Sequence, residues 1–427
     1  MNKLLLKNVQ TLLADGIVKT VDIAIENDKI IKIGNSDESW QADEILNCQN
    51  KFAIPGFVNS HTHAAMTLLR SYADDMNLMD WLQTKIWPIE AKMTDEDIYW
   101  GTMLAIAEMI KSGTTTFADM YASMDEVAKA VEETGIRAVL SRGMIGVAPT
   151  GEKALVEAAD LFKNYHNKAD GRITVMLGPH APYTCPPDYL EKVVEISKKL
   201  NAEIHIHLAE TLFEVEECKK QYGKSPIELM ESTGILERGV LAAHCVHLSD
   251  NDIALMKKYN VRVAHNPGSN MKLASGIAPV HKMLEAGLCV GLGTDGASSN
   301  NNLDMLEELR LATLLHKVNT LNPLIVPAYE GVLMATKYGA EAVGLKNSVG
   351  ILAEGYKADI TLFDTNNLWW TPQNDKVSLL AYSANSSQVD TTIVNGKILM
   401  KNRQLLTIDE EKILYEVNKR ADALMKQ

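Results

Sequence analysis

Two histidines separated by one residue, His61 and His63, stand at the end of a short apolar run that contains Pro55 and Gly56. On an extended strand, the side chains of residues i and i+2 point to the same side. The two imidazoles can therefore approach one point, an arrangement that suits a divalent metal ion. The pattern His-x-His is frequent by chance, so its meaning depends on the side chains that join it.

His207 and Asp295 end two other apolar runs. With His61 and His63 they would offer a metal three imidazoles and one carboxylate, a set that suits zinc and leaves a position for water. One divalent metal ion, most simply Zn²⁺, would lower the pKa of that water and make it a nucleophile. Taken singly, each histidine could be a hydrogen-bonded core residue and Asp295 a turn residue. The agreement of their positions at strand ends favours the metal site.

A hydrolytic metal site also needs a group that moves protons. Glu210 follows His207 by three residues and is expected over the metal, where a carboxylate can pass a proton from water to substrate. Its alternative is a residue at a helix N-terminus, favoured by the helix dipole. His244 could hold the attacking water by a hydrogen bond or be a core residue. His205 is interpreted as structural because it lies deeper in the strand, and His247 as a loop residue.

The elements that must position these residues alternate between apolar runs and helical segments. Helix start signals occur at Ser123–Glu126, a capping box, and in weaker form at Thr94 with Asp97 and Ser249 with Asp252. Eight alternations predict the α/β class and a (β/α)8 TIM-like barrel. A doubly wound open sheet is the alternative, but no glycine-rich phosphate loop follows the first run. The apolar runs cover residues 54–60, 114–118, 138–141, 173–178, 202–206, 240–243, 261–264 and 289–293.

A polar or ionisable residue follows each of these runs. In a barrel of this type, the carboxyl ends of the strands form the active-site face. A purely structural barrel would have little reason to gather most of its histidines there. The residues at these ends are His61 and His63, Asp119, Arg142, His180, His207 with Glu210, His244, His265 and Asp295.

The two ends of the chain carry short strands joined by turns, and Asn395-Gly396 is a strong hairpin signal. We therefore expect a small β-sandwich domain built from residues 1–53 and 350–405. Residues 54–349 would form the catalytic barrel, and residues 406–427 a C-terminal helix packed on the outside.

Composition limits the function classes. The 427 residues carry a net charge of −13, which argues against nucleic-acid or anionic-membrane partners because phosphate binding needs clustered Lys and Arg. No run approaches the roughly 20 apolar residues of a membrane span. The five scattered cysteines form no Cys-x-x-Cys motif, and the first residues lack a signal-peptide cleavage site. We expect a cytoplasmic protein with reduced cysteines.

Five motifs stand out along the chain. They are Pro55-Gly-Phe-Val-Asn-Ser-His-Thr-His63, His207-Leu-Ala-Glu210, Ala243-His-Cys-Val-His247, His265-Asn-Pro-Gly-Ser-Asn270 and Gly293-Thr-Asp-Gly296. Together they resemble the amidohydrolase superfamily, and more narrowly its methylthioadenosine/S-adenosylhomocysteine deaminases. The resemblance spans nearly the whole chain. It implies a mononuclear metal site, because the segment 173–180 has no lysine that could be carboxylated as in binuclear members. It also implies a homo-oligomer and a small-molecule nucleoside substrate.

The resemblance assigns roles residue by residue. His61, His63, His207 and Asp295 would bind the metal. Glu210 would protonate the purine N1, His244 would orient the attacking water, and Asp295 would also act as the base that passes a proton to the leaving amine. Glu90 would bind the ribose hydroxyls, and Arg142 and His180 would line the nucleoside pocket.

Several substrate positions have structural alternatives. Glu90 could be a surface ion-pair residue, and Arg142 an anion clamp or a barrel ion pair. The segment 77–88, with Trp81 and Trp87, could be a lid or simply packing. Some members carry a further arginine after the third strand, whereas residues 143–155 offer only Lys153. Methylthioadenosine or adenosine would then be handled as well as, or better than, S-adenosylhomocysteine.

Other functions remain open at this point. Within enzymes, the alternatives are a deaminase of another ring, such as guanine or a triazine, and a hydrolase of cyclic amides. From a different class, a non-catalytic scaffold could keep the barrel fold, since fold alone does not fix function. A scaffold would be expected to lose its ligands, yet all four and Glu210 are present.

Overall fold

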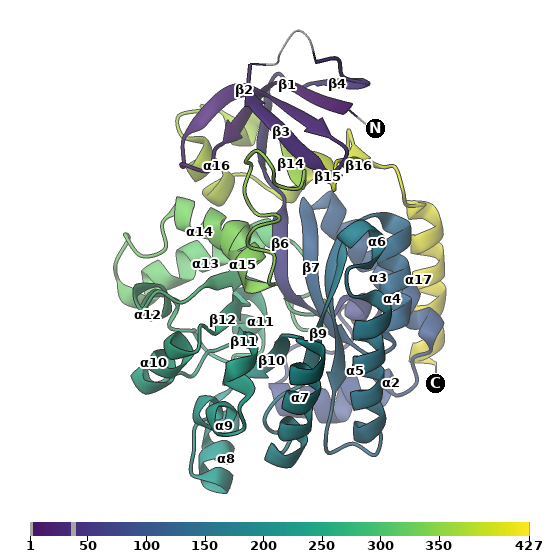
Figure 1. The fold of residues 1–427 in the computed structure, drawn as a ribbon, viewed down its shortest axis with the longest axis vertical. Helices are drawn as coiled ribbons and strands as arrows, with labels where there is room; N and C mark the ends of the chain where they lie inside the picture. The colour runs from purple at the N-terminus through teal and green to yellow at the C-terminus, as the bar shows by residue number, and fades with distance from the viewer. Residues whose placement is uncertain (1–2, 36–39, 427) are drawn as a thin grey trace.

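The computed structural model describes residues 3–35 and 40–426, and in this part the chain forms a parallel barrel and a separate sheet (Figure 1). Residues 1–2, 36–39 and 427 of the expected domains lie outside the described residues. The predicted α/β class and the barrel are confirmed. The exact division into 1–53 with 350–405, 54–349 and 406–427 stays a prediction.

The barrel contains eight parallel strands among the described residues, each hydrogen-bonded to the next in chain order. All eight predicted apolar runs contribute to them. The strands are β6 (Phe57–Thr62), β7 (Thr114–Tyr121), β8 (Arg137–Met144), β9 (Ile173–Pro179), β10 (Ile204–Leu208), β11 (Val240–His244), β12 (Arg262–His265) and β13 (Val290–Leu292).

The last strand returns to the first, which excludes the open sheet. Just past β13, the backbone N–H of Asp295 donates to the carbonyl oxygen of His61 at 3.0 Å. The side chain of Asn59 reinforces this join, because it exchanges hydrogen bonds with the backbone N–H and the hydroxyl of Thr294 at 3.0 and 2.7 Å. Closure of the barrel therefore brings Asp295 against His61.

The predicted first barrel strand, residues 54–60, is divided at Gly56. Residues up to Pro55 belong to β5 (Lys51–Pro55), which pairs with β14 (Ile360–Asp364) in the other sheet, and β6 begins at Phe57. A Cβ atom on Gly56 would lie 2.1 Å from Cγ2 of Thr115, so only glycine fits where the chain passes from one sheet to the other. The apolar run 54–60 shows no break at Gly56 because the cause of the break, contact with Thr115, comes from a distant part of the sequence.

Helices cover the outside of the barrel and alternate with its strands (Figure 1). The main ones are α3 (Asp95–Lys111), α4 (Met124–Thr134), α5 (Gly151–Tyr165), α7 (Pro187–Leu200), α8 (Leu212–Tyr222), α9 (Pro226–Ser232), α10 (Asp250–Lys258), α11 (Pro267–Lys272), α12 (Val280–Glu285), α13 (Met305–Thr320), α14 (Ala328–Ala335) and α15 (Lys337–Ala342). Shorter segments are η1 (Ala64–Leu69), α6 (Lys168–Gly171) and η3 (Ile235–Arg238).

Two of the three predicted helix starts are capping boxes. Thr94 begins α3 and Ser249 begins α10, each with reciprocal hydrogen bonds to the residue three positions on. The box predicted at Ser123 is wrong. This residue has a φ of 47°, and its hydroxyl donates instead to Asp95 at 2.7 Å. A contact with another helix therefore replaces the local cap.

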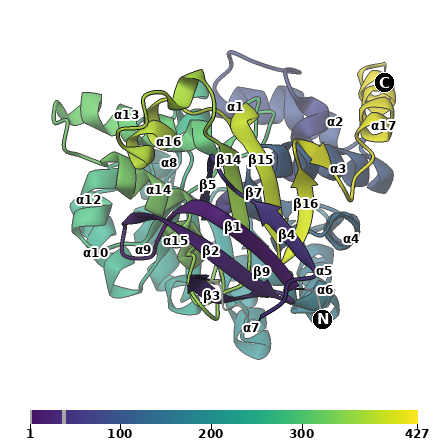
Figure 2. The same ribbon diagram turned by 90° about the horizontal axis from the view of Figure 1, so that it is seen from above.

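The strands of both chain ends join in one sheet, which has nine strands among the described residues (Figure 2). β5 and β14 connect the two ends, and the Asn395-Gly396 turn links β15 and β16 as the sequence predicts. A separate apolar core that includes Leu6, Ile23 and Ile360 lies within this domain. The remaining strands are β1 (Lys3–Leu12), β2 (Val18–Glu26), β3 (Lys29–Gly34), β4 (Glu44–Asn47), β15 (Val389–Val394), β16 (Lys397–Lys401) and β17 (Gln404–Leu405).

A buried ion pair fastens this sheet domain to the barrel. Arg137, the first residue of β8, donates from Nε and Nη2 to the two carboxylate oxygens of Asp359 at 2.8 and 3.0 Å. Its Nη2 also donates to Asn395 at 3.1 Å. Both members of the pair are almost completely buried. Short helices η4 (Leu368–Trp370), α16 (Lys376–Tyr382) and η5 (Ser386–Gln388) complete the domain.

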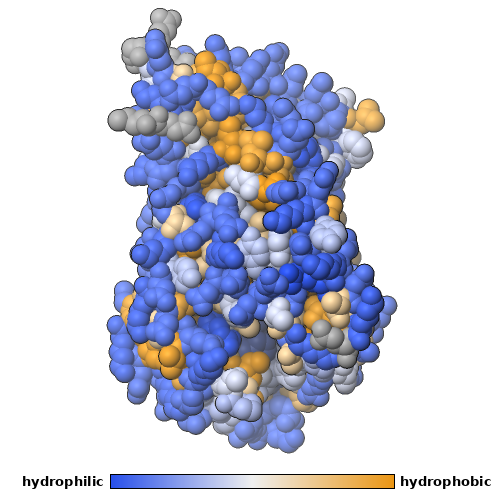
Figure 3. Space-filling model, turned by 90° about the vertical axis from the view of Figure 1, so that its right-hand side faces the viewer, coloured by the Kyte–Doolittle hydropathy of each residue, from blue (hydrophilic) through white to orange (hydrophobic). Residues whose placement is uncertain are grey.

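The chain ends in α17 (Glu410–Met425), which packs on the outside of α3 as expected (Figure 1). Arg420 on α17 forms ion pairs with Glu96 and Asp97 at the start of α3, at 2.8 and 3.1 Å. On the face shown in Figure 3, hydrophilic side chains predominate, and hydrophobic ones gather mainly over the domain of the chain ends. Among the described residues, no helix has both the length and the apolar character that crossing a bilayer requires.

Candidate active site

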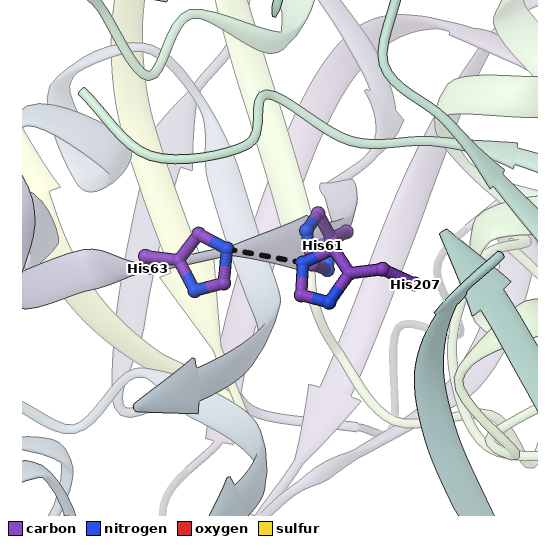
Figure 4. Close-up of side chains that lie close together, drawn as sticks. All are labelled: His61, His63 and His207. Carbon is purple, nitrogen blue, oxygen red and sulfur yellow. Dashed lines mark hydrogen bonds between the residues drawn. The ribbon is translucent and has the colours of Figure 1, made fainter. Parts of the chain in front are cut away.

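Three histidines and one aspartate meet at the carboxyl ends of the barrel strands. Figure 4 shows His61, on β6, and His63, the residue just after β6, facing His207, on β10. The Nε2 atoms of His63 and His207 are 3.3 Å apart, and Oδ1 of Asp295 lies 3.3 Å from Nε2 of both His61 and His63. The structure thus brings the four predicted ligands together, although they come from three separate parts of the sequence.

The hydrogen bonds behind these imidazoles leave Nε2 free to face the cluster. Nδ1 of His63 lies 2.6 Å from the carbonyl oxygen of Met120, and Nδ1 of His207 lies 2.7 Å from that of His180. A carbonyl can only accept, so both Nδ1 atoms carry the proton and both Nε2 atoms offer a lone pair. Nε2 of His61 is buried and has no hydrogen-bond partner in the part of the chain that the structure describes. This donor set fits a divalent cation.

His205 has a closer relation to the cluster than the sequence analysis assigned. Its Nε2 lies 2.8 Å from Nδ1 of His61, and the ring is fully buried. This contact fixes the ring of His61 from behind. The alternation of His205 and His207 along the strand was the signal for it, since both side chains point into the barrel.

Two serines orient the carboxylate of Asp295. The hydroxyls of Ser269 and Ser299 donate to Oδ2 at 2.7 and 2.8 Å, while Oδ1 faces the histidines. Ser269 lies in the motif 265–270, to which the sequence analysis gave no role beyond resemblance. No local pattern marks Ser299, because its partner is reached only through the fold.

Glu210 and His244 lie beside the cluster. Oε2 of Glu210 is 3.8 Å from Nε2 of His244, and both side chains are buried. Burial raises the pKa of Glu210, which favours its protonated form. His244 adopts a φ of 71°, and its Nδ1 lies 2.9 Å from Oδ1 of Asn270. The carboxyl group of Glu210 and the imidazole of His244 therefore lie side by side next to the cluster of possible metal ligands.

A second carboxylate fixes the backbone of Glu210. Glu214, on α8, accepts hydrogen bonds from the N–H groups of Ala209 and Glu210 at 2.8 and 3.0 Å. Ala209 has a φ of 50°, so the chain turns sharply between His207 and Glu210. This turn aims Glu210 toward the cluster. Glu214 was missed in the sequence, where it reads as an ordinary first-turn acid.

The cluster lies at the bottom of a cavity of about 1060 Å³, open mouth included. The predicted substrate residues Glu90, Arg142 and His180 all line it. The predicted lid also reaches it, through α1 (Leu78–Trp81), the π-helix η2 (Leu82–Ile86) and α2 (Trp87–Glu90). Trp81 and Trp87 are both among the lining residues. The cavity thus combines an apolar wall with a few polar groups, as small-molecule sites do.

The polar groups of the cavity wall have fixed partners. Glu90 accepts a 2.5 Å hydrogen bond from the hydroxyl of Tyr121, a residue that the sequence analysis missed, and burial raises the pKa of Glu90. Nε of Arg142 donates to Glu157 at 2.8 Å. His180 contacts Thr184 through Nδ1 at 3.0 Å, and burial lowers its pKa to about 3. His180 is therefore a neutral polar group.

Two of the strand-end residues belong neither to the cavity lining nor to the cluster of metal-type donors. His265 turns toward α13, where its Nε2 lies 3.1 Å from Nε2 of His316. Asp119 accepts a hydrogen bond from the backbone N–H of Ala64 at 2.7 Å, and burial raises its pKa to about 6. The expectation that every polar strand end belongs to the site is wrong for these two, because each has a structural partner instead.

A (β/α)8 barrel with three imidazoles and a carboxylate around one point defines a class of proteins that hold a divalent metal ion at the carboxyl ends of their strands. The chain belongs to the amidohydrolase family, whose model matches residues 52–399. The family and the donor set together support a divalent metal at this site.

Relatives and solved structures cover the chain from end to end. It is 54% identical to a 5-methylthioadenosine/S-adenosylhomocysteine deaminase of Desulforamulus reducens, over 99% of both chains. A protein of the same name from Dictyoglomus thermophilum is also 54% identical, over 100% of both. The crystal structure of an adenosine deaminase from Xanthomonas campestris with bound zinc superimposes with a TM-score of 0.96. It is 30% identical and covers 100% of this chain and 99% of its own.

Proposed function

We propose that this protein is a hydrolytic deaminase of 6-aminopurine nucleosides, which it converts to the 6-oxo analogue and ammonia. Its substrates would be 5′-methylthioadenosine and S-adenosylhomocysteine, with adenosine as a third candidate. The convergence of His61, His63, His207 and Asp295 at the bottom of the cavity carries this proposal. The names of the full-length relatives at 54% identity support it.

His61, His63, His207 and Asp295 would hold the metal, and Zn²⁺ is supported by the ligand types and by the zinc-bound relative. When bound, the ion supplies Lewis-acid chemistry that lowers the pKa of a water molecule. The Nδ1 contacts of His63 and His207 hold their rings with Nε2 inward, and the serines hold Asp295 with Oδ1 inward. These contacts orient the proposed ligands toward one point.

The side chains around the cluster account for every proton of the reaction. Glu210, whose pKa is raised by burial, donates a proton to N1 of the purine while water attacks C6. His244 orients the attacking water by a hydrogen bond, and Asp295 takes a proton from it. Asp295 passes this proton to the 6-amino group, and the C6–N6 bond breaks to release ammonia. The remaining hydroxyl proton returns to Glu210, which restores the enzyme and leaves the 6-oxo group.

The cavity wall would hold the rest of the nucleoside. The carboxylate of Glu90 is a suitable acceptor for the ribose hydroxyls, and the hydrogen bond from Tyr121 fixes its position. Lid residues such as Trp81 offer an apolar surface for the base or the 5′ thioether. The homo-oligomer and the cytoplasmic location expected from the sequence stay predictions; sedimentation analysis tests the first.

Ammonia release, measured across a panel of nucleosides and free bases, tests the proposed function. We expect turnover of 5′-methylthioadenosine, S-adenosylhomocysteine or adenosine, and little with guanine or a triazine. Turnover of free bases alone would reject the nucleoside class. A folded preparation that holds no stoichiometric metal, and gains no activity when zinc is added, would favour the non-catalytic scaffold.

A further inference from the structure

The cavity has one guanidinium, and a carboxylate outside the cavity already pairs with it. We propose that Glu157, on α5, makes the cavity select nucleosides whose 5′ substituent is uncharged over nucleosides whose 5′ substituent ends in a carboxylate. This inference rests on the proposed function and deepens it. It assigns a specificity-determining role to a residue that does not itself line the cavity.

The charge balance of the cavity wall favours this reading. Three acidic side chains line the cavity, from Glu90, Glu210 and Asp295, and Arg142 is the one lysine or arginine among the lining residues that the structure describes. An anionic group of a substrate therefore has a single side-chain cation to meet. Whatever reduces the attraction of Arg142 reduces the affinity for that anion.

Arg142 is already engaged on two of its nitrogens. Nε donates to Oε2 of Glu157 at 2.8 Å, and Nη1 donates to the carbonyl oxygen of Gly143. This leaves Nη2 as the nitrogen without a protein acceptor in the described part of the chain. The side chain is 18% exposed, so a ligand can reach it. Arg142 is the register neighbour of Tyr121 in the barrel sheet, and the hydroxyl of Tyr121 donates to Glu90, the proposed acceptor for the ribose. Among the described residues, Arg142 has no hydrogen bond to the four metal-type donors.

Glu157 is held in this position by Lys153, one helical turn before it. Nζ of Lys153 lies 3.0 Å from Oε1 of Glu157, while Oε2 faces Arg142. Both cations lower the pKa of Glu157, so it is ionised at neutral pH. Lys153 does not line the cavity, and its side chain is 75% exposed. A substrate carboxylate that approaches Nη2 therefore meets a guanidinium whose charge Glu157 partly neutralises.

The affinity for an uncharged 5′ group does not depend on the attraction between that group and Arg142. The residues that follow Arg142 and also line the cavity are Gly143 and Ile145, which offer an uncharged surface beside the guanidinium. A methylthio group can pack there without a counter-ion. The ratio of kcat/KM between an uncharged and an anionic 5′ group should therefore depend on Glu157.

The test uses two nucleosides that differ in one charge, 5′-S-(2-carboxyethyl)-5′-thioadenosine and its methyl ester, with 5′-methylthioadenosine as the reference. The zinc-loaded Glu157→Gln variant keeps the size of the side chain and an acceptor for Arg142 but removes the negative charge. We expect kcat/KM for the carboxylate to rise about 5-fold relative to its ester, the size expected for one partly screened charge. Values for the ester and for 5′-methylthioadenosine should stay near wild type.

Two further variants complete the experiment. Glu152→Gln is the matched control: Glu152 lies on the same helix and pairs with Lys192 at 2.6 Å, outside the cavity lining. It should leave the ratio unchanged. Arg142→Gln should shift the ratio the opposite way, because Glu157 would then face the anion without its partner.

The outcomes separate this inference from the proposed function. An unchanged ratio in Glu157→Gln, or a ratio that moves against the carboxylate, would overturn the role of Glu157 while deamination continues. An equal change for acid and ester would also overturn it, since a merely structural role does not distinguish charge. If the wild-type protein deaminates none of the three nucleosides, the proposed function itself fails.

Discussion

In the proposed mechanism Glu210 gives the purine its proton, and among the described residues Glu210 is the acid with an ion-pair contact to His244, at 3.8 Å. Glu210→Gln should retain the metal, because Glu210 is not one of the four ligands, but should lower kcat by about 10²- to 10⁴-fold. Stopped assays with metal analysis on the same preparation measure both. Glu216→Gln, on the exposed side of α8, is the control and should behave as wild type. Near-normal turnover in Glu210→Gln would reject its role.

In the proposed mechanism Asp295 is both a metal ligand and a base. Its replacement should therefore affect metal binding as well as turnover, whereas replacement of Glu210 should affect turnover alone. In Asp295→Asn, one ligand loses its charge and the base is lost as well. We expect weaker metal binding together with a loss of kcat of at least about 10²-fold. Competition with a chromophoric chelator measures the affinity. Unchanged affinity would remove Asp295 from the ligand set.

At this scale the sequence predicted the charged and imidazole groups well and their supports poorly. His61, His63, His207 and Asp295 were recognisable because strand periodicity and position agree. Ser299 and Tyr121 were not, because an isolated hydroxyl carries no signal until the fold shows what it contacts. His265 was misjudged for the same reason, since its partner His316 lies on a helix 51 residues away.

At the scale of elements, α13 supports the site through one buried carboxylate. Glu308 accepts hydrogen bonds from the backbone N–H of Gly268 at 2.9 Å and from Nδ2 of Asn300 at 2.8 Å. The neighbours of these two residues are Ser269 and Ser299, the serines that orient Asp295. Glu308 therefore holds two loops in the positions that the site needs.

Glu308 also gives the protein a predicted pH dependence. Burial raises its pKa to about 8 from 4.5, so the folded state holds this proton more tightly than the unfolded state does. The free energy of unfolding should then fall as the pH rises from about 4.5 to about 8. Glu308→Gln should flatten this slope, measured by denaturant unfolding across the range. Glu307, the residue before Glu308, is exposed, and Glu307→Gln should leave the slope of the free energy of unfolding with pH unchanged.

The order of elements was predictable, and their exact ends were less so. Strand and helix periodicities located all eight barrel strands. The break at Gly56 escaped because its cause is the side chain of Thr115, far away in sequence. A helix does begin after Ser123, but the capping box predicted there is absent, because the hydroxyl of Ser123 donates to Asp95 instead. Local patterns are reliable where no tertiary contact opposes them.

For the whole molecule, the pair Arg137–Asp359 joins the two parts of the fold. Arg137→Met should destabilise the protein by about 3–5 kcal/mol, because Asp359 would be left buried without its cation. Catalysis should change little, since the pair does not line the cavity. Denaturant unfolding measures the loss. Lys346→Met, which breaks an exposed pair with Glu341, is the control and should cost less than about 1 kcal/mol.

That the two chain ends share one domain could be anticipated from strand-like runs at both ends. How they join could not, because pairing of β5 with β14 depends on residues more than 300 positions apart. Local sequence patterns predict where a strand lies but do not predict which strands pair with it in the sheet.

The hydrogen bond from the Asp295 N–H to His61 has a consequence for the life of the protein in the cell. This bond closes the barrel, and its two residues are also two of the four proposed ligands. The complete proposed ligand set can form only when the first and eighth strands have met. Binding of the ion would then be a late event in folding, after the barrel has closed.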